Sequence, residues 1–342
     1  MKHYRILTVD GGGVRGLISA IWLHHLQQQL SQPIQTYFDL ISGTSSGSII
    51  ACGLAAGIDT QTLVNLLLHD AQLMFPSSKT SIWQPLSWLF RDPYRHPIYD
   101  GTAMSTFLQQ MFGGMRFGEL VKPTLATSYD MLNRTPLLFH STDLAHANLP
   151  VWEVCRASTA IPAYFPPHTV SLQGQAIPCI DGAFAAKNPT MSAIAAMFKA
   201  NQQVNQHSTQ PLNLDQIVVA SFGVGRLKPE VSAAQARRLR ALASAVPLVH
   251  ALVDGPADLT DSLAEQMLAA NHYFRFQTAL AVEDKVDDTD PAHLNLLADA
   301  AETYINGIGK AKLDALAQLL TQSQQRTERP ISLWPVAVRS AC

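Results

Sequence analysis

Short apolar runs and helical segments alternate at the start of the chain. Residues 5–9 form an apolar, β-branched run, and residues 17–30 carry apolar side chains at the spacing of an amphipathic helix. The same order repeats with an apolar run over residues 37–41 and a helix-like run over residues 48–56. Strands that alternate with helices are typical of a parallel sheet covered by helices. The pattern therefore predicts a three-layer α/β/α fold with a mainly parallel central sheet.

The rest of the chain continues this pattern without a linker or an internal repeat. Predicted strands occupy residues 124–129, 136–139, 176–180, 216–221 and 272–276, and predicted helices occupy residues 101–112, 190–200, 291–320 and two segments within 233–270. Residues 201–213 are expected to form a polar surface loop and residues 321–342 a surface strap. The simplest domain count is one, over residues 1–342, with the motifs in about residues 4–200 and the remainder completing the fold.

A serine lies between two glycines where the second strand meets its helix. Residues 43–47 (GTSSG) predict a strand, a sharp turn and a helix. Glycines two residues before and after a serine allow this bend, which is the G-x-S-x-G nucleophile elbow. A turn of small residues can give the same pattern by chance, so the neighbouring motifs matter. We take Ser45 as the candidate nucleophile, with Gly43 and Gly47 as support.

A glycine-rich loop joins the first strand to its helix. Residues 10–16 (DGGGVRG) place backbone N–H groups at a helix N-terminus, where they can hold an anion. One candidate is a dinucleotide pyrophosphate, because the loop satisfies G-x-G-x-x-G and Asp39 follows at the distance of a ribose-binding acid. The other is the oxyanion that forms when a serine attacks an ester carbonyl. The oxyanion is favoured, because a parallel sheet would place this loop beside the serine turn.

A serine nucleophile needs a base within hydrogen-bond reach. The α/β-hydrolase order places several strands before the elbow, whereas Ser45 follows only two. A dyad with a single carboxylate is the alternative. Asp181 ends the predicted strand at 176–180, and active-site groups gather at strand ends in open α/β sheets. The pair Asp181 and Gly182 is also typical of a plain turn, which is the favoured interpretation for Asp181 taken alone.

The three motifs together resemble the signature of the patatin-like phospholipase family. That signature is a D-G-G-G-x-R-G loop, a G-x-S-x-G elbow and a D-G-G or D-G-A turn. The chain carries all three in this order, at residues 10–16, 43–47 and 181–183. The one departure is Ala183, where many members have glycine.

Two further segments are similar to the family. Residues 155–167 (CRASTAIPAYFPP) resemble the segment that leads into the third motif, and residues 271–275 (NHYFR) resemble a later one. The resemblance is specific over about residues 4–200 and looser to about residue 280.

The resemblance implies a lipid acyl hydrolase with a serine–aspartate dyad. Ser45 would be the nucleophile, Asp181 the proton acceptor, and the oxyanion hole would consist of the amides of Gly11, Gly12 and Gly13. The supporting motif residues would be Asp10, Arg15, Gly16, Gly43, Gly47, Gly182 and Ala183. Arg15 would either fix the loop by pairing with a carboxylate or lie solvated. The expected substrate is a phospholipid or galactolipid at a membrane surface, and no cofactor is expected.

Two other functions stay open at this point. Acyl transfer to an acceptor other than water, or non-specific esterase activity, would use the same serine and loop, although a related fold does this with a histidine partner and Asp181 argues against it. Some bacterial relatives are phospholipases activated by a cyclic dinucleotide, and residues 201–290 could hold such a site. The basic run there is Arg237, Arg238 and Arg240, and a solvated helix face is the simpler interpretation.

Composition limits the partners. The chain of 342 residues has 47% hydrophobic and 15% charged residues, and this charged share is below the roughly one quarter typical of soluble proteins, which predicts an apolar surface. A formal net charge of −2 gives no field that would attract nucleic acid or anionic lipid. The 12 histidines form no metal-binding pattern, and the 4 dispersed cysteines are expected to be reduced and buried. Oligomeric state has no signature in the sequence.

The expected location is the cytoplasm with peripheral membrane contact. No charged and then apolar leader precedes the first strand, and no apolar stretch is long enough to span a bilayer, although export without a signal sequence stays open. Residues 75–99 place Trp83 and Trp88 among prolines and arginines, a composition that suits the boundary between water and lipid. A lid or interfacial patch is one interpretation, and a proline-rich loop whose tryptophans fill a gap in the core is the other.

Overall fold

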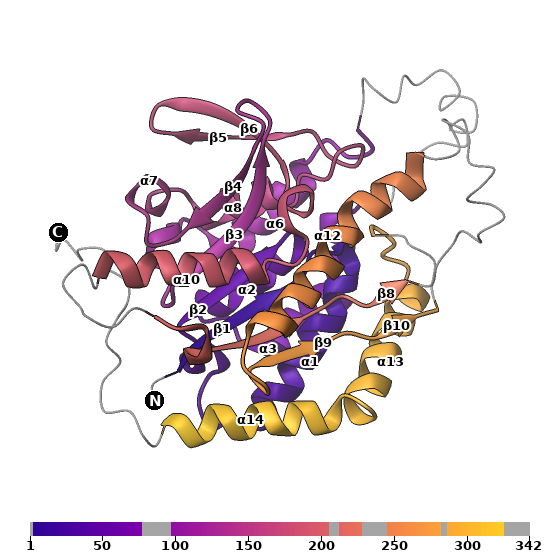
Figure 1. Cartoon of the computed structure of the whole chain (residues 1–342). Helices are drawn as coiled ribbons and strands as arrows, with labels where there is room; N and C mark the ends of the chain where they lie inside the picture. The colour runs from indigo at the N-terminus through magenta and orange to yellow at the C-terminus, as the bar shows by residue number, and fades with distance from the viewer. Residues whose placement is uncertain (1–2, 77–96, 205–211, 228–244, 282–285, 325–342) are drawn as a thin grey trace.

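The computed structural model describes residues 3–76, 97–204, 212–227, 245–281 and 286–324. Within these ranges the centre is an eight-stranded sheet with strand order β5-β6-β3-β2-β1-β7-β9 and with β4 paired to β3 (Figure 1). Its strands are β1 (Tyr4–Val9), β2 (Leu40–Thr44), β3 (Thr124–Asp130), β4 (Thr135–His140), β5 (His168–Leu172), β6 (Gln175–Asp181), β7 (Ile217–Phe222) and β9 (Tyr273–Phe276). β8 (Arg226–Leu227) and β10 (Ala279–Leu280) form a separate parallel pair.

The central strands are parallel, and one end of the sheet is antiparallel. β1 pairs in parallel with β2 and with β7, and the register places Val9 beside Gly43 and Phe222. β3 joins β2 in parallel, and β9 joins β7 in parallel. β4, β5 and β6 are antiparallel to their neighbours. The prediction of a mainly parallel sheet is confirmed, and the loops after β1 and β2 lie side by side.

Alternate residues of the central strands contact helices on opposite faces of the sheet. Leu7 and Val218 belong to a larger core on one face, whereas Ile6 and Val219 belong to a smaller core on the other. The helices on the smaller core are α10 (Thr190–Val204) and α12 (Ala245–Met267) (Figure 1). The helices on the larger core are α1 (Gly16–Gln28), α2 (Ser46–Ala55), α3 (Thr60–Leu68), α4 (Ala71–Met74), α6 (Thr102–Phe112), α8 (Val151–Ser158), α13 (Pro291–Asn306) and α14 (Lys310–Gln324). The three-layer α/β/α prediction is confirmed.

Short helical turns connect these elements. They are the short helices α7 (Leu144–Ala147) and α9 (Ala183–Ala186) and the 3-10 turns η1 (Gly13–Arg15), η2 (Ile34–Tyr37), η3 (Phe117–Glu119) and η4 (Leu214–Gln216). Two of them, η1 and α9, immediately follow the glycine loop and the Asp181 turn.

Three predicted boundaries are wrong. The helix predicted over residues 291–320 is two helices, because residues 307–309 (GIG) separate α13 from α14 and glycine is a poor helix former. The strand predicted at residues 37–41 starts only at Leu40, because η2 occupies the residues before it. α10 extends to Val204, into the predicted loop. The remainder of that loop (205–211), residues 228–244 and the strap from residue 325 onward lie outside the described residues.

Candidate active site

Ser45 lies at the apex of a sharp turn between β2 and α2. Its backbone has φ 53° and ψ −127°, outside the regions that residues with a Cβ usually adopt. Gly43 and Gly47 allow the turn to close. A Cβ at Gly43 would lie 2.1 Å from the Gly47 carbonyl oxygen, and a Cβ at Gly47 would lie 2.4 Å from the Val9 oxygen. The backbone therefore has the strand, turn and helix that the pentapeptide predicts.

The Ser45 hydroxyl donates a hydrogen bond to Asp181, with 2.7 Å between Ser45 Oγ and Asp181 Oδ2. β3 brings the two residues together. Thr44 at the end of β2 pairs with Thr127, and Asp181 at the end of β6 pairs with Ser128, the next residue of β3. Because β4 occupies the other edge of β3 along both stretches, β2 and β6 meet end to end on one edge.

β6 reaches the site from the direction opposite to that of the parallel strands. The sequence predicts Asp181 at the end of a strand, and the structure adds that this strand is antiparallel to β3. The carboxyl ends of β2 and β6 therefore face each other, which places the Ser45 hydroxyl and the Asp181 carboxylate at the same point of the sheet.

The Asp181 carboxylate is buried and accepts hydrogen bonds at both oxygens. Oδ1 accepts from the Ala183 N–H at 2.7 Å, and Oδ2 accepts from Ser45. Burial raises the pKa of Asp181 to about 6, although the hydrogen bonds from Ala183 and Ser45 and the charge of Lys187 act in the opposite direction. At neutral pH this carboxyl is ionised, and it is a stronger base than an ordinary aspartate.

The three glycine amides of the loop after β1 differ in their hydrogen bonds. Gly11 N–H donates to the carbonyl oxygen of Lys187 at 3.0 Å, and Gly12 N–H donates to Ser46 Oγ at 3.3 Å. Gly13, with φ 59°, has an N–H without a hydrogen-bond partner in the described part of the chain. The Gly11 amide is thus committed to the fold, and the amides of Gly12 and Gly13 are the ones that can meet a new oxyanion.

Ser158 on α8 is hydrogen-bonded to Ser45 and to Gly182, the residue after Asp181. Its hydroxyl accepts a hydrogen bond from Ser45 N–H at 2.9 Å, and its carbonyl oxygen accepts one from Gly182 N–H at 3.0 Å. No motif marks Ser158 by itself, although it belongs to the segment 155–167 that resembles the family. Arg15, for which the sequence left two interpretations, is only 4% exposed and is therefore not a solvated surface residue.

A small, mainly apolar pocket adjoins the Ser45 turn. Its lining includes Gly13, Ser45, Ser46 and Thr159. The remaining wall is hydrophobic and comes from α2, α3, α4, α6 and the segment after α8, through Ile49, Leu67, Met74, Phe75, Met104 and Ile161. A hydrocarbon chain attached to a carbonyl at Ser45 has a matching environment here.

Residues 286 and 287 lie next to the glycine loop. The Val14 N–H donates to the Val286 carbonyl oxygen at 2.9 Å, and the Tyr99 hydroxyl donates to Asp287 Oδ2 at 2.8 Å. The Tyr99 ring contacts Phe165, with 5.4 Å between ring centroids.

Trp83 and Trp88 of the predicted lid lie outside the described residues.

The described residues contain no candidate for a metal site or for a membrane span. No group of three or more His, Cys, Asp or Glu side chains there could hold a metal ion. No helix among those residues is long and apolar enough to cross a bilayer. Cys52, Cys155 and Cys179 are free and buried, and Cys342 lies outside the described ranges.

Comparison with known proteins decides the family. A family model described as Patatin-like phospholipase matches residues 7–194, more than half of the chain. The chain belongs to the patatin-like phospholipase family. A similar family member is Patatin-like protein 1 from Arabidopsis thaliana, 29% identical over 253 residues, which span 66% of this chain but only 59% of that protein. The family name supports a lipid hydrolase.

Membership of the patatin-like phospholipase family does not by itself establish catalysis. Another relative, Probable inactive patatin-like protein 9 from Arabidopsis thaliana, is 27% identical over 299 residues, 81% of this chain and 75% of that protein. Among solved structures, VipD from Legionella pneumophila aligns with a TM-score of 0.45 and 12% identity, covering 95% of this chain and 76% of that one.

Proposed function

We propose that the chain hydrolyses acyl esters of membrane lipids, with Ser45 and Asp181 as a catalytic dyad. The observation that carries the proposal is the hydrogen bond of 2.7 Å from Ser45 Oγ to a buried carboxylate oxygen of Asp181. Membership of a phospholipase family and an apolar pocket beside Ser45 support the same conclusion. The substrate class is a phospholipid or galactolipid, and the product is a free fatty acid.

The proposed reaction uses Asp181 as a base twice. As Ser45 Oγ attacks the acyl carbonyl, Asp181 accepts the hydroxyl proton and the carbonyl oxygen becomes negative. The N–H groups of Gly12 and Gly13 donate to this oxyanion. The C–O bond to the lipid alcohol breaks, and the alcohol takes the proton from Asp181 and leaves an acyl ester on Ser45. Water then attacks the ester, Asp181 accepts its proton, and Ser45 regains the proton as the fatty acid leaves.

The existing hydrogen bonds of the loop favour Gly12 and Gly13, rather than all three glycines, as donors to the oxyanion. Gly11 N–H already donates to Lys187, and turning it toward the substrate would break that bond. Gly13 N–H is the strongest candidate, because it borders the pocket together with Ser45 and bonds to no other described residue. Ser46 Oγ would release the Gly12 N–H when the oxyanion forms, since their 3.3 Å contact is long.

Acyl transfer to another alcohol is the alternative that shares this site. The only side-chain hydrogen bond that Ser45 Oγ forms within the described residues is to Asp181, so a histidine base has no support there. Water competes with an alcohol for the acyl group whenever it reaches the acyl ester. Among the described residues, no contact at the site favours a second alcohol. For activation by a cyclic dinucleotide, Arg237, Arg238 and Arg240 lie outside the described residues, and no described contact favours it.

A labelling and hydrolysis experiment tests the proposal. Wild type, Ser45→Ala, Asp181→Asn and the control Ser262→Ala, an exposed serine on α12, are incubated with a fluorophosphonate probe and, separately, with vesicles of mixed phospholipids and galactolipids. We expect probe labelling and fatty-acid release in wild type and in Ser262→Ala. Ser45→Ala should lose both, and Asp181→Asn should lose fatty-acid release. Full activity in Asp181→Asn would point to another base, and release that survives in Ser45→Ala would end the proposal.

A further inference from the structure

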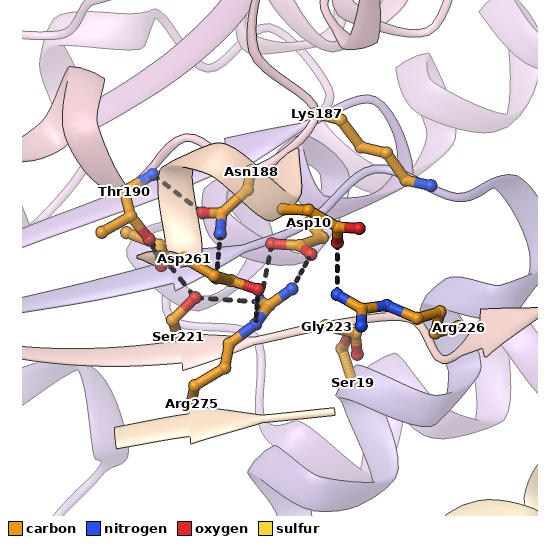
Figure 2. Close-up of polar contacts among 12 residues, drawn as sticks. Asp10, Ser19, Lys187, Asn188, Thr190, Ser221, Gly223, Arg226, Asp261 and Arg275 are labelled. Atoms are coloured by element: carbon orange, nitrogen blue, oxygen red, sulfur yellow. Dashed lines mark hydrogen bonds and ion pairs between the residues drawn. The ribbon is translucent and has the colours of Figure 1, made fainter. Parts of the chain in front are cut away.

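The side chain of Arg275 lies in a buried polar cluster at the start of the glycine loop (Figure 2). Arg275 Nη1 and Nη2 donate to the two carboxylate oxygens of Asp10 at 3.0 and 2.6 Å. Nε donates to Asp261 Oδ2 at 3.0 Å, and Nη1 also donates to Ser221 Oγ at 3.0 Å. Arg275 is 7% exposed and Asp10 is 1% exposed, so each group contacts the other in place of water.

The geometry of this cluster requires a guanidinium. Burial alone would lower the pKa of Arg275, but the facing carboxylates of Asp10 and Asp261 raise that pKa above its ordinary value and keep the group charged. Two parallel hydrogen bonds to one carboxylate fix both the distance and the plane of Asp10. A lysine at this position would keep the charge but lose the planar fork.

Two chains of contacts lead from this cluster to the amide of Gly11. One runs through Asp10, whose carboxylate is bound by Arg275 and whose backbone continues directly into Gly11. The other runs through Asp261, which accepts a hydrogen bond at 2.7 Å from Asn188 Nδ2. Asn188 follows Lys187, whose carbonyl oxygen accepts the Gly11 N–H at 3.0 Å. Both routes therefore fix the position of Gly11, the first glycine of the loop.

We propose that Arg275 is a positioning residue for the oxyanion hole: by binding Asp10 and Asp261 together, it fixes the glycine loop in the orientation that points the Gly12 and Gly13 amides at the substrate. This inference rests on the proposed function, since it assigns Arg275 a role in that reaction. Arg275 is 265 residues from Asp10 and lies beyond residues 7–194, where the family model matches. Residues outside the motif-bearing segment thus complete the site.

A neighbouring ion pair provides a matched control. Asp258 lies one helical turn before Asp261 on α12 and pairs with Arg226, the first residue of β8. The two side chains are 58% and 55% exposed, in contrast to the buried Arg275 and Asp10. This pair has the same chemistry and also involves a residue of α12, but its described contacts do not include the glycine loop.

The experiment compares Arg275→Met and Arg275→Lys with the control Arg226→Met, using a soluble ester, a trifluoromethyl ketone that forms a tetrahedral adduct with serine, and the fatty-acid product as a ground-state inhibitor. We expect Arg275→Met to lower kcat about 10²-fold, the effect of a small misplacement at the reacting centre. KM should stay within about twofold of the wild-type value. Affinity for the ketone should fall in parallel with kcat and affinity for the fatty acid should not.

Arg275→Lys keeps a positive charge against Asp10 and should fold even if Arg275→Met fails to fold. We expect kcat of Arg275→Lys to be about tenfold higher than that of Arg275→Met and to stay below the wild-type value. Wild-type kcat in Arg275→Lys, or a loss of kcat without a matching loss of ketone affinity, would overturn the inference. Arg226→Met should match wild type in every measurement. A similar loss of kcat in Arg226→Met would mean that ion pairs to α12 act only through general stability, and would overturn the inference.

Amide hydrogen exchange of the peptide that contains residues 10–16 supplies a readout that does not depend on activity. We expect faster exchange of this peptide in Arg275→Lys than in wild type and no change in Arg226→Met. If the wild-type protein hydrolyses no ester, the proposed function fails, and the exchange data still decide whether Arg275 holds the loop. If wild type is active and exchange is the same in all variants, only the inference about Arg275 fails.

Discussion

Thr44 and Asp181 pair with consecutive residues of β3, Thr127 and Ser128. The distance between Ser45, the proposed nucleophile after Thr44, and its carboxylate partner is therefore set by the register of three strands rather than by a flexible loop. A shift of β6 by one residue would move Asp181 by about 3.3 Å and turn its side chain to the other face of the sheet. The hydrogen bond between Ser45 and Asp181 depends on this register.

The rate of ester hydrolysis should rise with pH around the pKa of Asp181. Burial raises that pKa to about 6, and a base is active only when deprotonated. We expect kcat/KM on a soluble nitrophenyl ester to increase from pH 4.5 and to level off above pH 7, with a midpoint near 6. A flat profile over this range would contradict the assignment of Asp181 as base.

Replacement of Asp181 by asparagine should stabilise the protein at neutral pH. A folded-state pKa of about 6 lies above the ordinary value of 3.8, so the folded state loses stability as pH rises through this interval and the buried carboxyl ionises. Asp181→Asn removes that loss, which is up to about 3 kcal/mol at pH 8. Denaturant unfolding at pH 8 and pH 4.5 measures the difference. The gain should vanish at the lower pH, and equal gains at both values would refute the explanation.

An alanine at Gly47 should damage the elbow. Its Cβ would lie 2.4 Å from the Val9 oxygen, so the backbone of β1 or α2 must move, at a cost of about 1–3 kcal/mol of unfolding free energy. The same movement displaces Ser45 Oγ and should reduce kcat. The matched control is Gly114→Ala, because a Cβ there meets nothing within 4 Å. Thermal unfolding and ester hydrolysis of both variants test this, and a Gly47→Ala protein that equals the control would disprove it.

A larger side chain at Met104 should shorten the acyl chains that the enzyme accepts. Met104 is 2% exposed and lines the apolar pocket beside Ser45. We expect Met104→Phe to lower the ratio of kcat/KM for long over short nitrophenyl esters by about tenfold, and Met104→Ala to raise it. Met131→Phe, at an exposed position, is the control. An unchanged chain-length profile in both Met104 variants would mean that acyl chains bind elsewhere.

Local motifs predicted the individual parts of the site. The elbow at Ser45 and the turn after Asp181 each depend on glycines and on neighbouring residues, so a few positions in the sequence specify them. The alternation of strands and helices likewise predicted the parallel centre of the sheet. The boundary errors at residue 37 and near Gly307 arose where apolar content continues through a turn.

Long-range pairing accounts for what the sequence could not show. The antiparallel approach of β6 depends on its pairing with β3, and nothing within residues 175–181 specifies the direction of its neighbour. The bond from Gly11 N–H to Lys187 joins segments far apart in the chain. The cluster around Arg275 likewise needs β1, α12 and β9 in place. Residues 271–275 (NHYFR) resemble the family, but the sequence does not show which residues Arg275 contacts.

The separation of Ser45 from Asp181 by 136 residues has a consequence for biosynthesis. A domain generally folds as a unit during synthesis, and the N-terminal part of the chain leaves the ribosome first. Under the proposed mechanism, a nascent polypeptide that already exposes its serine has no general base until β6 has been translated and inserted beside β3. Under the same mechanism, a truncated translation product that lacks β6 would be unable to hydrolyse lipid.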